Sequence, residues 1–100
     1  MGVAFDVEHA PMFSVGQVAE LLGVQPAFVR RLDTEEVVQP ARSSGGQRRY
    51  SQVQVLRVEK VSEMAGDGLN LAGIRRILAL EAELDALKTQ IQTLQQQQGA

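Results

Sequence analysis

The last quarter of the chain contains the pattern that most restricts its fold. Apolar residues recur there at alternating spacings of three and four, which are the a and d positions of a heptad repeat. These residues are Ile77, Leu80, Leu84, Leu87, Ile91 and Leu94. No Gly or Pro interrupts residues 74–98, and the positions between are mostly charged, Gln or Ala. The pattern predicts one long helix with a single apolar seam.

Two arrangements would cover this seam. A helix from residue 71 to 98 would be about 42 Å long, and the domain before it is too small to cover residues 84–94. The repeat is too short to be stable alone, but it suits a dimer anchored on a folded domain. We therefore predict a homodimer joined through the six seam residues. The alternative is a helix folded back on its own domain.

Composition narrows the classes of function. The chain has 100 residues, no cysteine and one histidine, His9. These counts exclude disulfides and thiolate metal sites, and they leave too few histidines for a zinc site or a triad. No apolar run is long enough to span a membrane, and the N-terminus lacks the features of a signal peptide. We expect a cytoplasmic protein that is not an enzyme and needs no metal or cofactor.

The formal net charge of −2 conceals a basic segment. Residues 14–60 carry seven basic residues against five acidic ones, whereas both flanking segments are acidic. Within residues 42–57, Arg42, Arg48, Arg49 and Arg57 occur without any acidic residue. An anionic partner responds to the local excess of positive charge, so the acidic total does not argue against one.

Residues 14–32 have the pattern of two short helices joined by a tight turn. Ser14 and Gln17 fit a capping box, and apolar residues follow at helical spacing until Gly23. Gln25-Pro26 then starts a second helix with proline at its first position. This pattern is typical of a helix-turn-helix, although a plain helical hairpin has it too.

Residues 37–50 predict a small β ribbon. Val37-Val38 before Pro40 indicates extended backbone, and Ser43–Gly46 is a turn cluster. We expect two strands, roughly residues 37–41 with 47–50. Tyr50, at the end of the ribbon, is expected to pack the ribbon onto the core.

Two further helices complete the predicted fold, which is mainly α. Ser51 can cap a helix over about residues 52–65, whose apolar positions fit more than one face. Asn70 can cap the last helix. Residues 1–11 have no sustained period, and we expect them to form a flexible tail.

Taken in their order along the chain, these motifs resemble those of the MerR family of transcription regulators. Met12–Val24 looks like the first helix and turn of that family, Val29–Pro40 like its second helix, and Gly45–Ser51 like its wing, which ends in Arg-Arg-Tyr-Ser. Gly68–Ile77 is similar to the branch of heat-shock repressors called HspR. The resemblance covers about residues 12–78.

The resemblance implies a winged helix-turn-helix DNA-binding domain with a small β wing over residues 12–69. A C-terminal dimerisation helix over residues 70–98 would follow and form an antiparallel coiled coil. The resemblance also implies binding to double-stranded DNA at an inverted-repeat operator. In the HspR branch it implies repression of chaperone genes, with the chaperone itself as co-regulator.

The candidate DNA contacts lie on the second helix and the wing. Arginine binds phosphates and also reads the edge of guanine, and exposed positions opposite the apolar face of a recognition helix meet the bases. The candidates are Gln25, Ala27, Arg30, Arg31, Arg42, Arg48 and Arg49. A solvated helix face and a generic basic hairpin are the simpler interpretations of the same residues.

The chain departs from the family pattern in two places. The family usually has aromatic residues after the arginine of its second helix, whereas Arg30 is followed by Arg31-Leu32-Asp33. It usually has glycine in the next turn, where this chain has Glu35-Glu36. A left-handed backbone at Glu36 would cost about 1–2 kcal/mol. A second hypothesis therefore stays open: a protein-interaction module of the same fold, like the chaperone modulators, with weak or no DNA binding.

Overall fold

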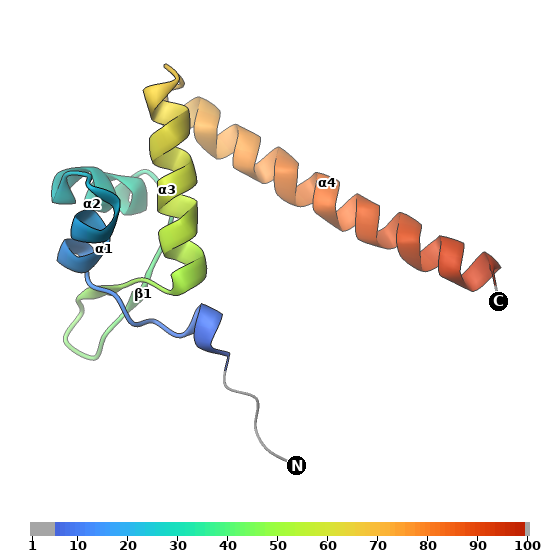
Figure 1. The fold of residues 1–100 in the computed structure, drawn as a ribbon, viewed down its shortest axis with the longest axis horizontal. Helices are drawn as coiled ribbons and strands as arrows, with labels where there is room; N and C mark the ends of the chain where they lie inside the picture. Colours follow the sequence, from blue (N-terminus) through green and yellow to red (C-terminus); the bar gives the residue numbers. More distant parts are fainter. Residues whose placement is uncertain (1–5, 100) are drawn as a thin grey trace, which may run out of the picture.

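Figure 1 shows the computed structural model, which describes residues 6–99. Its elements are η1 (Val7–His9), α1 (Val15–Leu22), α2 (Pro26–Thr34), β1 (Ala41–Arg42), β2 (Arg48–Arg49), α3 (Gln52–Gly66) and α4 (Leu71–Gln98). The first three α-helices gather around the short strands, and α4 projects away as one continuous helix (Figure 1). The fold is mainly helical with a small antiparallel sheet, as the sequence predicts.

The helix-turn-helix forms where its capping signals predict. The Ser14 hydroxyl accepts a hydrogen bond from the Gln17 backbone N–H at 3.2 Å, and the Gln17 side chain accepts one from the Ser14 N–H at 2.9 Å. Gly23 ends α1 with a φ of +66°, a left-handed conformation that glycine adopts without steric cost. Pro26 occupies the first turn of α2, where no backbone N–H is needed.

The core consists of aliphatic side chains around one tyrosine. Its fully buried members are Val18, Val29, Leu32, Val38, Tyr50, Val58, Val61 and Ile74. The Tyr50 hydroxyl donates a long hydrogen bond of 3.5 Å to the Val29 carbonyl. Burial raises the pKa of the Tyr50 phenol, so the hydroxyl keeps its proton. Tyr50 packs the end of the wing onto α2, as predicted.

The segment before α1 also takes part in the fold. Phe13 pairs with Tyr50 as an isolated antiparallel bridge, and η1 packs against α3. The predicted flexible tail did not include this turn of 3-10 helix at Val7–His9. Residues 1–5 of that predicted tail lie outside the described residues.

The wing is shorter than predicted. Only Ala41–Arg42 pairs with Arg48–Arg49. Val37 and Val38 are 8% and 2% exposed, and their backbone N–H groups both donate to the Leu32 carbonyl at the end of α2. The prediction of a strand from residue 37 is wrong, because burial of these valines in the core holds that segment in a turn.

α3 presents one of its possible faces to the core. Ser51 caps it through the predicted hydroxyl contact, here with the Gln54 backbone N–H at 3.1 Å. Val58 and Val61 are fully buried, whereas Leu56 is 64% exposed. The sequence alone does not predict which face of this helix is buried, because apolar residues lie on several sides of it.

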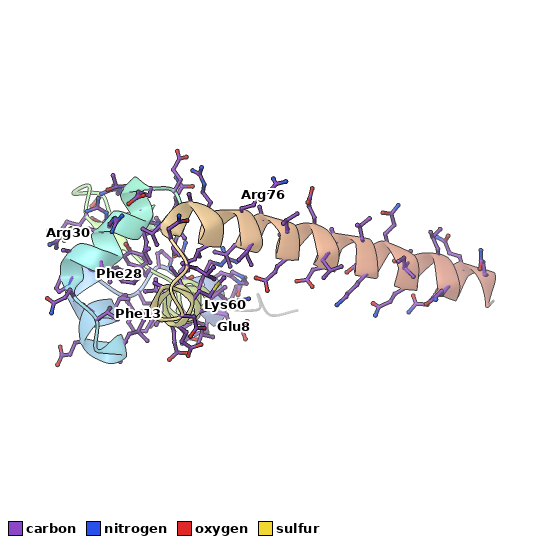
Figure 2. All side chains as sticks on the ribbon, turned by 90° about the horizontal axis from the view of Figure 1, so that it is seen from above. Glu8, Phe13, Phe28, Arg30, Lys60 and Arg76 are labelled. Atoms are coloured by element: carbon purple, nitrogen blue, oxygen red, sulfur yellow. The ribbon has the colours of Figure 1, made fainter. Side chains whose placement is uncertain are left out.

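α4 begins inside the core and continues into solvent. Asn70 caps it by accepting a hydrogen bond from the Gly73 N–H at 2.8 Å, and Leu71 and Ile74 are buried. Further along the seam, five residues are between 45% and 55% exposed: Leu80, Leu84, Leu87, Ile91 and Leu94. Figure 2 shows the C-terminal half of α4 without a neighbouring element. The alternative of a helix folded back on its own domain is therefore wrong.

The turn after α2 contains the strained position that the sequence suggests. Glu36 has a φ of +58°, and among residues 6–99 it is the one non-glycine residue with a positive φ. Its carboxylate lies 3.6 Å from the Arg75 guanidinium, and both side chains are more than half exposed. Because an exposed ion pair contributes little, this contact does not offset the cost of about 1–2 kcal/mol for a left-handed glutamate.

We expect Glu36→Gly to raise the free energy of unfolding by about 1 kcal/mol, since glycine removes the steric cost but loosens the unfolded chain. Glu36→Ala is the matched control. It removes the same ion pair but keeps the Cβ atom, so we expect no gain from it. Urea unfolding followed by circular dichroism, at one protein concentration, measures both variants. Equal stabilities would show that strain at this position is negligible.

Candidate nucleic-acid interface

An open basic groove lies where the start of α1, the middle of α2 and the wing meet. It has a volume of about 400 Å³ and is lined by Ser14, Val15, Gly16, Arg30, Arg42, Gly46, Gln47, Arg48 and Arg49. The three elements come together because the Phe13–Tyr50 bridge joins the wing to the start of α1, while buried Tyr50 contacts α2. Four of the lining residues are arginines, so the groove suits an anion.

The groove contains four of the seven predicted DNA-binding residues, all of them arginines. Gln25, Ala27 and Arg31 are exposed on α2, as predicted for its outer face, but they do not line this groove. Gln25 instead lines a separate hollow with Phe28 and residues of α3. The predicted set is therefore divided between the groove and the adjoining surface of α2.

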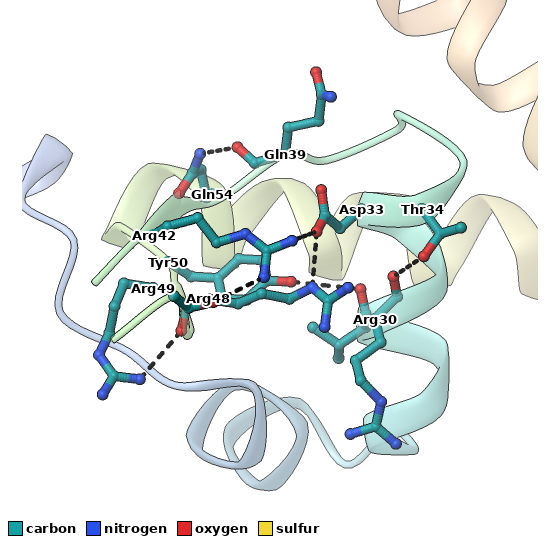
Figure 3. A network of polar contacts seen from close by, with 11 residues as sticks. Arg30, Asp33, Thr34, Gln39, Arg42, Arg48, Arg49, Tyr50 and Gln54 are labelled. Atoms are coloured by element: carbon teal, nitrogen blue, oxygen red, sulfur yellow. Dashed lines mark hydrogen bonds and ion pairs between the residues drawn. The ribbon is translucent and has the colours of Figure 1, made fainter. Parts of the chain in front are cut away.

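The arginines differ in how free their guanidinium groups are. Arg30 and Arg49 form no ion pair with a carboxylate in the described part of the chain. Arg49 donates to the Gln47 side chain and to the Arg48 carbonyl, both at 3.1 Å. Figure 3 shows the Arg30 side chain extending away from the polar network. Arg30 and Arg49 are thus the cations of the groove that an anion can approach directly.

Arg42 and Arg48 share one carboxylate oxygen (Figure 3). Arg48 Nε donates to Asp33 Oδ2 at 2.7 Å, and an Arg42 guanidinium nitrogen donates to the same atom at 3.0 Å. The side chains of Asp33 and Arg48 are only 14% and 23% exposed. Arg48, a candidate DNA contact on the wing, is thus held against α2 by this ion pair.

The acidic turn after α2 affects a different set of cations. Glu35 pairs with Arg31 one helical turn earlier, and both side chains are substantially exposed. Glu36 faces Arg75 at the start of α4. Neither acid pairs with a groove arginine, so the two glutamates leave the charge of the groove largely intact.

Sequence reasoning missed two parts of this site. Val15 and Gly16, in the first turn of α1, line the groove, and the backbone N–H groups of a first helical turn lack helical acceptors and attract anions. The capping box at Ser14 marks that helix start but not its position beside the wing. In the sequence, Asp33 is noticed only as part of the departure from the family pattern after Arg30. Its role was not predicted, because its partners are nine and fifteen residues away.

Other kinds of site find little support in the described residues. Between residues 6 and 99, no three His, Cys, Asp or Glu side chains gather in a way that suits a metal ion. No helix in that range combines the length and apolar character needed to cross a membrane.

A helix-turn-helix, a β wing and a basic groove between them define the class of winged helix-turn-helix DNA-binding proteins. The profile of one such family, the MerR HTH family regulatory proteins, matches residues 13–81. The chain belongs to this family of regulators, and the resemblance seen in the sequence is confirmed.

Curated relatives agree with this assignment. The chain is 35% identical over 82 residues to the "Putative heat shock protein HspR" of Streptomyces coelicolor, which covers 81% of this chain and 54% of that protein. It is 29% identical over 89 residues to the "HTH-type transcriptional regulator GlnR" of Bacillus cereus, which covers 88% of this chain and 69% of that protein. The chain thus spans about half the length of the HspR relative.

Solved structures match the fold. The N-terminal part of MtaN, the Bacillus subtilis multidrug transporter activator, superposes with a TM-score of 0.62 at 26% identity, covering 84% of this chain and 89% of that one. The regulator SkgA of Caulobacter crescentus gives a TM-score of 0.58 at 23% identity, covering 84% and 68%. The second likeness shows the fold alone.

Proposed function

We propose that this regulator acts as a dimeric repressor that binds double-stranded DNA at an inverted-repeat operator. The observation that carries the proposal is the basic groove between α1, α2 and the wing, where Arg30 and Arg49 have no carboxylate partner among residues 6–99. A duplex presents a dense line of phosphates, and arginines and helix-terminal amides are the groups that bind them. The membership in a family of helix-turn-helix regulators supports the same function.

In this proposal α2 is the recognition helix and enters the major groove. Its exposed side chains Gln25, Ala27, Arg30 and Arg31 face the bases or the adjoining phosphates. Arg49 on the wing contacts the backbone beside them. The likeness to HspR further supports chaperone genes as the regulated class, a chaperone as co-regulator and a cytoplasmic location on the nucleoid.

The protein-interaction hypothesis is the weaker of the two. It rests on the missing aromatic residues after Arg30 and on Glu35 and Glu36, which would repel phosphates if they faced the DNA-binding surface. These acids pair with Arg31 and face Arg75, outside the groove. The groove therefore keeps its positive charge, and DNA remains the partner that its chemistry fits best.

The first test is binding of random duplex DNA, measured by fluorescence anisotropy from about 50 mM salt upward. We expect binding that weakens steeply with salt, because each arginine–phosphate contact releases counterions. Arg49→Ala should lower affinity for every sequence and flatten the logarithmic salt dependence by about 1. Arg30→Ala should also alter sequence preference, by about 1–3 kcal/mol for each base that the arginine reads.

The matched control is Arg57→Ala, which removes the same charge from an exposed position on α3 outside the groove. We expect it to change affinity much less than Arg49→Ala. If the wild-type protein binds no genomic fragment at about 50 mM salt, the DNA-binding proposal is wrong and the interaction module replaces it.

The exposed seam of α4 supports the dimer. Six seam residues form one apolar line: Ile77, Leu80, Leu84, Leu87, Ile91 and Leu94. Full burial of each leucine or isoleucine contributes roughly 1.5–3 kcal/mol, so their sum offsets the entropy lost on association. In an antiparallel pair, two recognition helices would face the same side of DNA, about one helical turn or a small multiple apart.

We expect Leu84→Asp combined with Leu87→Asp to give a monomer, because dimerisation would bury two carboxylates from each helix of the seam. Ala86→Asp with Thr89→Asp adds the same charge to the opposite face of α4 and should stay dimeric. Sedimentation equilibrium measures the association, and anisotropy shows whether DNA affinity falls with it. A seam variant that remains dimeric would place the interface elsewhere.

A further inference from the structure

We propose that Asp33 is a specificity-determining residue. Its ion pairs with Arg42 and Arg48 keep these wing arginines from binding DNA phosphates, and this limits binding to non-operator sequences. The inference rests on the proposed DNA-binding function. It concerns an acid inside the basic site, where an acid would ordinarily weaken binding.

Asp33 connects α2 to both strands of the wing through one arginine on each strand. Arg42 and Arg48 are direct partners in the register of the two-stranded ribbon, so they stand opposite each other across it. One oxygen of Asp33 accepts hydrogen bonds from both, at 3.0 and 2.7 Å. A single carboxylate on α2 therefore holds both strands.

The contact also reaches the turn of the wing. A second Arg42 nitrogen donates to the Gly46 carbonyl at 3.2 Å. Since each strand is only two residues long, few ladder hydrogen bonds fix the ribbon. The orientation of the turn relative to α2 depends strongly on the line of contacts from Asp33 through Arg42 to Gly46.

A phosphate and the Asp33 carboxylate compete for the same donors. Both are anionic oxygens that accept charge-assisted hydrogen bonds from guanidinium groups. Asp33 is 14% exposed and already in place, whereas a phosphate must be brought from solution. Arg42 and Arg48 thus have part of their charge neutralised in the free protein, while Arg30 and Arg49 remain open to DNA.

This competition acts unequally on operator and non-operator DNA. Non-operator binding depends almost entirely on phosphate contacts, so it gains directly when two more arginines are released. Operator binding also needs base contacts from α2 with the wing held in one orientation. Loss of Asp33 should therefore raise non-operator affinity more than operator affinity.

The decisive variant is Asp33→Asn, which keeps the size and one acceptor oxygen but removes the charge. We expect it to bind a random duplex about tenfold tighter at about 50 mM salt, with a logarithmic salt dependence steeper by about 1 to 2. The ratio of affinities between a duplex enriched from a random library by the wild-type protein and a random duplex should fall. Glu81→Gln is the matched control, because it makes the same charge change in an exposed ion pair with Lys60 that lies outside the groove, and its effect should be smaller.

A second measurement separates charge from folding. Arg42→Gln with Arg48→Gln should abolish the gain, so the triple variant with Asp33→Asn should show none of the tenfold increase that Asp33→Asn alone gives over the wild type. If Asp33→Asn weakens binding without steepening the salt dependence, Asp33 is only a support of the wing and the inference is wrong. If the wild-type protein itself binds no duplex, the proposed function fails first.

Discussion

Burial of Tyr50 is the constraint on which the DNA-binding surface depends. This side chain is the largest that is fully buried, and its backbone bridges to Phe13 while its ring and hydroxyl contact α2. The start of α1, α2 and the wing are brought together at this one residue. The basic groove exists only where these three elements meet, so the apolar core determines the shape of a polar site.

Local signals in the sequence predicted most of the fold. Ser14, Gly23, Ser51 and Asn70 act through neighbours within a few residues, so their caps form as the sequence indicates. The wing was predicted too long because the local preference of Val37 and Val38 is for extended backbone. Their burial in the core of the domain determines their conformation instead. The ion pairs of Asp33 likewise needed the tertiary fold, since no pattern connects it to residues on the wing.

The acids on and after α2 show why a count of charges is a poor guide to a binding surface. Asp33, Glu35 and Glu36 lie within four residues, yet they face different cations on the wing, on α2 and on α4. Of these three acids, only Asp33 pairs with arginines of the groove. The helical period separates its direction from that of Glu35, and the left-handed backbone at Glu36 turns the chain away again.

α4 is part of both the domain core and the proposed dimer interface. The packing of the core therefore affects the geometry of the interface. Its first turns bury Leu71 and Ile74 in the core, while the same continuous helix carries the seam. The Lys60–Glu81 ion pair, at 2.8 Å, adds a contact between α3 and α4 beyond the buried turns. In the proposed dimer, the direction in which α4 leaves the core would set the position of the partner domain, because α4 is one continuous helix. The core packing at Leu71 and Ile74 would thus fix the spacing between the two copies of α2 in that dimer, although both residues are buried in the core.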